Sequence, residues 1–432
     1  MISTTFYNKL KSQKKILAVV FCILCFIYTT FAHPYFTGTI GVGGKIQPEP
    51  KKFPSILIDS YFAGQFDLSQ NLMLRTSFSM YTTESILKES IFRNTSAIFN
   101  LDEVSLTYRG SFGQLSHLLG FYIGEYDPVG SDVFLQRQFG IPSFASKLTE
   151  SICGISRAKI YDMSGIGGSY VVKFPQSALG LNIYYNKTEN GESLLESLNT
   201  DFRVAGAWNL GALDFSFGLT MPMKHEILLA DDTTQKVILL IERADMHAGL
   251  TAFFGSSNSS SLLFQAGFTK LIIDPNEEND EKVLSFNDVY ILIEPRFVSK
   301  NMCLSISLFN MPETTKENLF YVNNPVGVST SLYTPWLSLS GRKSQFGLMA
   351  TLSSSTSLDA LIVNNETTDS GTEGNTSNLK DSLGLSISPY GIMYLGAGKL
   401  NFSLNIDAFN IKDWDSFLKN ISVIAGYKVA LW

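Results

Sequence analysis

The stretch Leu72–Tyr81, LMLRTSFSMY, alternates between two kinds of side chain. One set is Leu72, Leu74, Thr76, Phe78 and Met80, and the other is Met73, Arg75, Ser77, Ser79 and Tyr81. Successive side chains of a β-strand point to opposite faces. The stretch therefore predicts a strand with one mainly apolar and one mainly polar face.

The same two-residue period returns along most of the chain, for example in residues 213–221 and 400–408. No composition break divides residues 33–432, so we expect one domain. Many one-sided strands and no long apolar run after the first 32 residues are typical of a barrel whose apolar side faces lipid. The pattern predicts an all-β fold, a closed antiparallel transmembrane β-barrel of about 14 to 16 strands.

The expected connections alternate between short and long. Short turns fall at 67–71, 110–114 and 299–301, and long polar segments fall at 84–95 and 353–381. Barrels of the bacterial outer membrane have short periplasmic turns and longer external loops. This spacing therefore predicts the same division between two rims.

The first 32 residues have the pattern of a cleavable signal peptide. Four lysines precede the short apolar run 16–28, and Thr30-Phe31-Ala32 offers small residues before a cleavage site. The run has about 13 residues, short of the roughly 20 that a membrane-spanning helix needs. Cleavage would leave 29 basic and 39 acidic side chains, which argues against nucleic-acid binding. It would also leave two cysteines, Cys153 and Cys303, too few for a disulfide scaffold.

Together, the signal, the one-sided strands, the alternating connection lengths and the final strand pattern 421–431 resemble a porin-like outer-membrane β-barrel channel of a diderm bacterium. The resemblance implies an outer-membrane location, contact with outer-membrane lipid and assembly by the barrel assembly machinery. It also implies a polar lumen through which small solutes diffuse passively.

If the apolar side chains face lipid, the strand charges must face the lumen, because a charge in lipid is costly. The expected pore-lining residues are Asp59, Arg75, Glu103, Arg109, Lys173, Arg203, Asp214, Arg243, Asp245, Asp288, Glu294, Arg296, Asp407 and Lys428. Seven are acidic and seven basic, which predicts a channel with weak ion preference.

Residues 127–159 form the candidate gate. The segment is too long for a turn and more apolar than the other connections, so we expect it to fold into the barrel or cover its mouth. The alternative is a strand pair with a short helix outside. The candidate gating residues are Asp132, Arg137, Phe139, Phe144, Lys147 and Glu150.

Enzyme chemistry has little support in the sequence. The chain contains four histidines, no G-x-S-x-G motif and no Cys/His set with zinc spacing. We therefore expect no catalytic residues, no metal site and no cofactor.

Three other functions or folds remain open at this point. The Phe-rich part of the 127–159 segment also suits an outer-membrane carrier for hydrophobic solutes, of the fatty-acid transporter kind. Long loops suit a surface-exposed barrel that acts as an adhesin or receptor. A soluble secreted β-sandwich is disfavoured, because a two-layer core does not explain so many strands with apolar outer rows.

Overall fold

The computed structural model describes most of the chain from Tyr35 to Leu431. The described ranges are 35–47, 55–82, 85–86, 96–149, 159–186, 196–228, 234–241, 244–256, 259–273, 288–316, 319–339, 341–356, 382–409, 411 and 420–431. The predicted signal peptide (1–32), Arg243 and Glu150 lie outside the described residues.

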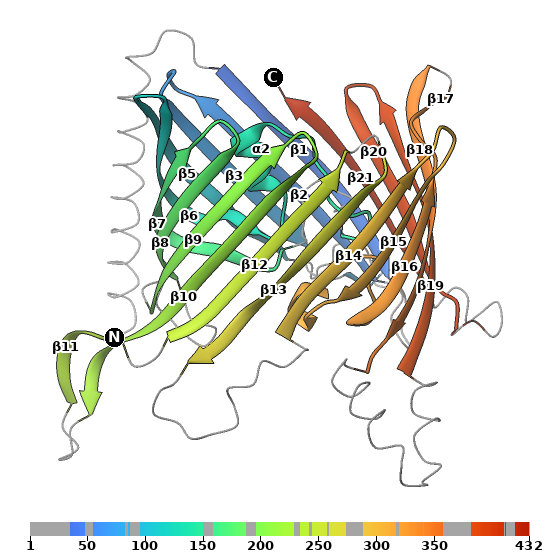
Figure 1. The fold of residues 1–432 in the computed structure, drawn as a ribbon. Helices are drawn as coiled ribbons and strands as arrows, with labels where there is room; N and C mark the ends of the chain where they lie inside the picture. The colour runs from blue at the N-terminus through green and yellow to red at the C-terminus, as the bar shows by residue number, and fades with distance from the viewer. Residues whose placement is uncertain are drawn as a thin grey trace.

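Eighteen antiparallel strands form one closed ring (Figure 1). In ring order they are β1 (Tyr35–Gln47), β2 (Ser55–Asp67), β3 (Leu72–Thr82), β5 (Ala97–Phe112), β6 (Leu115–Val129), β7 (Tyr161–Lys173), β8 (Ser177–Asn186), β9 (Ser197–Trp208), β10 (Gly211–Leu228), β12 (Ala244–Gly255), β13 (Ser261–Ile273), β14 (Val289–Val298), β15 (Cys303–Asn310), β16 (Val326–Tyr333), β18 (Arg342–Ser354), β19 (Leu383–Leu395), β20 (Gly398–Asp407) and β21 (Ile421–Leu431). The pairing of β1 with β21, from Gly38 opposite Leu431 to Ile46 opposite Val423, closes the ring. The predicted fold class, a closed antiparallel β-barrel, is confirmed.

Three short strands pair with ring strands beside the main ladder. They are β4 (Ser85–Ile86), β11 (Thr234–Ile241) and β17 (Leu337–Leu339), which pair with β2, β10 and β18. The helices within the described ranges are α2 (Val133–Phe139) and α3 (Glu313–Lys316). Neither these nor any other described helical stretch combines the length and the hydropathy of a membrane-crossing helix.

The ring has more strands than the 14 to 16 that the sequence predicts. Strand β1 is the clearest cause, because its sequence YFTGTIGVGGKIQ contains four glycines and lacks a regular apolar row. Glycine weakens a strand on its own and often marks a bend, so this sequence does not predict a strand. In the barrel, β1 is paired along its whole length with β2. Pairing on both edges thus stabilises a segment whose own sequence is a poor strand former.

The two faces of the wall differ in chemistry. Phe121 on β6 is 54% exposed on the outside, while its neighbour Tyr122 is fully buried on the inside. The same contrast holds between Phe202 and Arg203 on β9, which are 48% and 1% exposed. The exterior is therefore a continuous apolar surface, and the interior carries the polar side chains.

The connections divide between two rims. Seven connections of two to five residues, such as those between β2 and β3 and between β5 and β6, lie at one end, here called the turn rim. The eight-residue connection between β16 and β18, which contains β17, lies at the same end, and the other connections, of seven to 31 residues, lie at the opposite end, here called the connection rim. The barrel is drawn with its turn rim uppermost in Figure 1. This division agrees with the predicted alternation of turns and loops.

Candidate functional site

The lumen is partly filled by the connection between β6 and β7. The chain leaves the wall at Asp127, whose φ of 40° lies in the left-handed region that Asp tolerates better than most residues. Helix α2 follows and contacts the inner faces of β6 and β9. Its residues Phe134 and Leu135 are buried, as is Leu148 further along. Residues 130–149, here called the inward segment, thus pack inside the ring.

An ion-pair network ties α2 to the wall. Arg137 donates hydrogen bonds to Asp127 and, at 2.8 Å, to Glu103 on β5. Burial disfavours the charge and lowers the pKa of Arg137, but the two carboxylates outweigh it and leave the pKa above its ordinary value. Arg137 therefore stays charged and holds the helix against β5 and β6.

A second arginine anchors the same turn from β9. The guanidinium of Arg203 makes bidentate hydrogen bonds to Asp214 on β10, at 2.8 and 2.5 Å. It also donates to the backbone oxygen of Asp127 at 2.6 Å, and the ring of Phe134 lies 4.1 Å from its central carbon. Three hydrogen bonds in the plane of the guanidinium and an aromatic ring near its central carbon thus fix the orientation of this planar group.

The far end of the inward segment contacts the opposite part of the wall. Phe144 stacks on Phe253 of β12, with centroids 4.7 Å apart, and its backbone oxygen accepts from Arg296 of β14 at 2.8 Å. Ser146 donates to Glu294, which also accepts from Arg296 at 2.7 Å. The segment therefore crosses the lumen from β5 and β6 to β14.

Two glycines make room for the ends of this connection. A Cβ on Gly249 of β12 would lie 2.5 Å from Val129, and one on Gly267 of β13 would lie 2.6 Å from Ile160. No side chain fits at these distances without displacing its neighbour. Glycine is required here by close approach.

A second connection folds inward, which the sequence reasoning missed. Between β15 and β16, Tyr321 and Val322 are buried, and Asn405 of β20 donates to the backbone oxygen of Phe320 at 3.0 Å. Tyr321 also lies 6.4 Å from the ring of Tyr390 on β19. The only signal in the sequence is the apolar run Leu319–Val322 within a polar connection.

One sector of the wall is left accessible on its inner face. On β9, the inward side chains Asn199, Asp201 and Arg203 are at most 1% exposed, because the inward segment and its neighbours cover them. On β2 and β3, the inward-facing Gln65 and Arg75 are half-buried instead. The sector β21–β1–β2–β3, here called the open sector, thus has solvent on its inner side.

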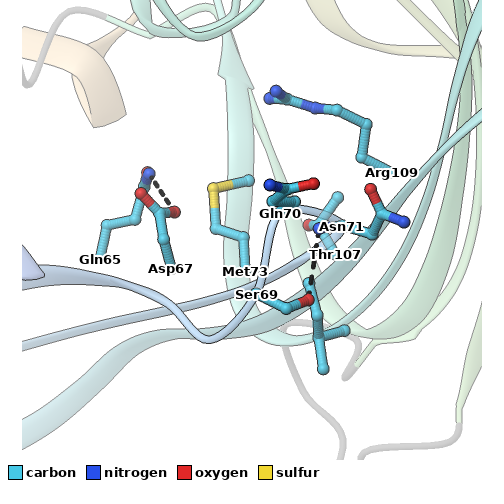
Figure 2. A pocket seen from close by; sticks show the side chains of 9 residues that line it. Gln65, Asp67, Ser69, Gln70, Asn71, Met73, Thr107 and Arg109 are labelled. Atoms are coloured by element: carbon cyan, nitrogen blue, oxygen red, sulfur yellow. Dashed lines mark hydrogen bonds between the residues drawn. The ribbon is translucent and has the colours of Figure 1, made fainter. Parts of the chain in front are cut away.

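A cavity of about 220 Å³ lies where the open sector reaches the turn rim (Figure 2). Its polar walls include Asp67, Arg109 and Thr107. Gln65 donates to Asp67 at 3.0 Å and accepts from Arg75 at 3.1 Å, so the carboxylate and the guanidinium are joined through one amide. The mouth at this rim is therefore polar and carries both signs of charge.

The predicted pore-lining residues fall into three groups. Glu103, Arg203, Asp214, Asp245 and Glu294 are buried in the wall or under the inward segment. Asp59, Arg75, Lys173, Arg296, Asp407 and Lys428 are half-buried, and Arg109 is exposed. Asp288 lies one residue before β14 and is exposed at the connection rim.

The candidate gating residues other than Glu150, which lies outside the described residues, are on the inward segment. Arg137 and Phe144 anchor the segment as described. The side chain of Asp132 links the two ends of this stretch by accepting hydrogen bonds from Ser143 at 2.6 Å and from the backbone N–H of Phe144 at 3.0 Å. Lys147 lies 6.0 Å from the ring of Tyr333 on β16. Phe139 lies 5.7 Å from the ammonium of Lys173.

A hydrogen-bonded group around one histidine, His247, lies inside the wall and was not predicted as a site. His247 lies 3.0 Å from Asp201, which also accepts a hydrogen bond from Tyr161 at 2.8 Å. All three side chains are buried. No group of three potential metal ligands occurs among the described residues.

Comparisons with known proteins return solved structures of barrels. The chain is similar to OmpF of Salmonella typhi in complex with daunomycin, at 11% identity over 92% of this chain and 97% of that one, with a TM-score of 0.39. It is similar to OprB of Pseudomonas putida, at 10% identity over 92% and 94% of the two chains, with a TM-score of 0.42. It is also similar to OccAB3 of Acinetobacter baumannii, at 9% identity over 93% and 100%, with a TM-score of 0.46.

No protein-family model matches the chain, and no curated protein matches it. The function of the barrel therefore has to be inferred from the chain's own residues. Its closed ring, apolar exterior and polar interior give it the architecture of a porin-like outer-membrane β-barrel.

Proposed function

We propose that this protein is a bacterial outer-membrane channel through which small polar solutes diffuse passively. The observation that carries the proposal is the contrast between the two faces of the open sector. Its outer face is apolar, with Ile40 and Val42 of β1 almost half exposed, while its inner face is polar and partly accessible. Lipid outside and water inside satisfy both faces.

The proposed pathway runs along the open sector, beside the inward segment. Thr37, Thr39, Asp59, Gln65 and Arg75 all lie on the inward phase of β1, β2 and β3. A lining of hydroxyl, amide and charged groups favours hydrated solutes over fatty acids, which need an apolar conduit. The polar lining therefore favours the channel over the hydrophobic-solute carrier.

Two adjacent substitutions on β1 test the pathway. Thr39 faces inward and pairs with the small residues Ala63 and Ala430, whereas Ile40 faces outward. Thr39→Trp places an indole in the pathway and should lower single-channel conductance on the order of twofold, because conductance follows pore diameter. Ile40→Trp adds the same side chain on the lipid side and should leave conductance unchanged.

The measurement is single-channel current of the purified full-length protein in planar bilayers, after gel mobility with and without heating shows that each variant is folded. Discrete openings that Thr39→Trp narrows support the proposal. Folded wild-type protein without any conductance would contradict it. Binding of fatty acid in that silent case would support the carrier instead.

A further inference from the structure

Charges on the inner wall are sorted by height. On the strands from β20 through β21 and β1 to β7, five basic residues lie within three positions of the strand ends at the turn rim and are at least partly accessible. They are Arg75, Arg109, Lys173, Lys399 and Lys428. The accessible acid at the same height is Asp67. The described turn-rim half of the open lumen therefore has a surplus of positive charge.

The opposite half has the opposite sign. Toward the connection rim, the partly accessible inward acids are Asp59 on β2, Asp102 on β5 and Asp407 on β20. Asp102 faces inward through its hydrogen bond from Ser79, at 2.8 Å. Lys45 on β1 is the basic residue at this height. Among the described residues, acids thus exceed bases here.

The buried charges do not cancel this difference. Arg203 with Asp214, Arg296 with Glu294, and Arg137 with its two carboxylates lie in ion pairs under or within the inward segment. The first two pairs are neutral as units, and Arg137 with its two carboxylates carries one net negative charge, with Asp127 two residues from the connection-rim end of β6.

Neutral groups lie beside three of the turn-rim cations. The ammonium of Lys428 lies 5.9 Å from the ring of Tyr61, and that of Lys173 lies 5.7 Å from the ring of Phe139. Arg75 donates to the neutral amide of Gln65 at 3.1 Å. Aromatic faces and amides orient a cation without removing its charge.

Glycine brings one of these lysines into the lumen. Lys428 of β21 is opposite Gly41 of β1, and Gly41 is opposite Tyr61 of β2. Because Gly41 has no side chain, the side chain of Lys428 can lie across β1 toward the ring of Tyr61. Lys399 of β20 is opposite Lys428, so two basic residues stand side by side at this mouth.

We infer that the lumen carries a fixed axial field, positive at the turn rim and negative toward the connection rim, and that the channel conducts unequally in the two directions. A narrow passage with low-dielectric walls focuses the field of its wall charges. Anions concentrate at the turn-rim mouth and cations at the other mouth. A voltage of one sign drives both kinds of ion from their enriched mouth into the passage and raises the ion concentration there, and the reverse voltage lowers it. The inference rests on the proposed channel function.

The test is the current through single wild-type channels at equal positive and negative voltages. In 0.1 M KCl the Debye length is about 10 Å, so the wall charges act across the passage, and the two currents should differ on the order of twofold. In 1 M KCl the Debye length is about 3 Å, and the ratio should approach one. Each single channel has one orientation, so random insertion changes only the sign.

Charge-removing variants assign the effect to the wall. Lys399→Gln/Lys428→Gln should bring the current ratio at 0.1 M KCl close to one. Lys45→Gln removes a basic residue from the connection-rim half of β1 and should raise the ratio instead of lowering it. If the first variant does not fold, the salt series on the wild-type protein decides alone.

Two failures are distinguishable. Open channels with equal currents at both voltages in 0.1 M KCl would overturn the axial field and leave the channel function in place. Folded protein that never conducts would overturn the channel function itself, and the field inference with it.

Discussion

At the scale of single residues, the interior is organised by arginines that each make hydrogen bonds or ring contacts with several groups. Arg203 is the clearest case, since it joins β9, β10, the backbone at Asp127 and the ring of Phe134. Alternation along β9 places Arg203 inside, and that much follows from the sequence. Its partners do not follow, because Asp127 lies 76 residues away and reaches Arg203 only when β6 turns inward.

Removing this arginine should destabilise the barrel. Arg203→Met leaves the buried Asp214 carboxylate without its partner, which costs about 3–5 kcal/mol for a buried pair. Arg203→Met/Asp214→Leu removes both charges and should recover most of that loss. The free energy of unfolding in urea, followed by the heat-sensitive gel shift, measures both. Arg342→Met, at the exposed start of β18, is the control, and equal stability of the Arg203→Met variant and wild type would refute the role of the pair.

At the scale of elements, the alternating pattern predicted strands well and the connections less well. A strand's period of two is visible in the sequence of that strand alone. Inward folding of a connection depends on partners elsewhere in the chain. Gly249 and Gly267 leave room for Val129 and Ile160, and Asn405 donates a hydrogen bond to Phe320. The long Phe-rich connection 127–159 still stood out by its length and apolar content. The four apolar residues Leu319–Val322 were too few to do so.

The inward segment should loosen when its anchor is removed. Arg137→Gln deletes the ion pairs to Glu103 and Asp127 and leaves a neutral polar side chain in place. We expect α2 to leave the wall more often, with noisier single-channel current and faster cleavage of residues 130–149 by added protease. Arg342→Gln, on the exposed start of β18, should change neither. Unchanged current and unchanged proteolysis in the Arg137 variant would show that apolar packing alone holds the segment.

At the scale of the whole molecule, the sign of the wall charge varies with height, although its total is nearly balanced. The sequence contains this order, because Arg109 and Lys173 directly precede short turns and Asp245 and Asp407 lie next to long connections. A total count of acidic and basic residues does not reveal this order. The order emerges only when each charge is placed relative to the rim that its strand approaches.

The lipid-facing surface makes a prediction that depends on depth. Leu181 lies in the middle of β8 and faces outward, so Leu181→Arg should destabilise the barrel folded in lipid vesicles by about 2–4 kcal/mol. Leu262, the second residue of β13, faces outward beside the turn rim. Leu262→Arg should cost about 0–1 kcal/mol, as arginine does near the interface. Urea titration of vesicle-folded protein compares the two, and equal costs would contradict a lipid-facing exterior.

The hydrogen-bonded seam between β1 and β21 has a consequence for how the molecule is made. These strands are the most distant pair in the chain, yet each supplies the only cover for the other's open edge within the ring. A partly synthesised chain therefore cannot be a smaller finished barrel, because it ends in two unpaired edges that invite aggregation. Completion has to wait for the final strand to arrive, so the growing polypeptide needs protection until then.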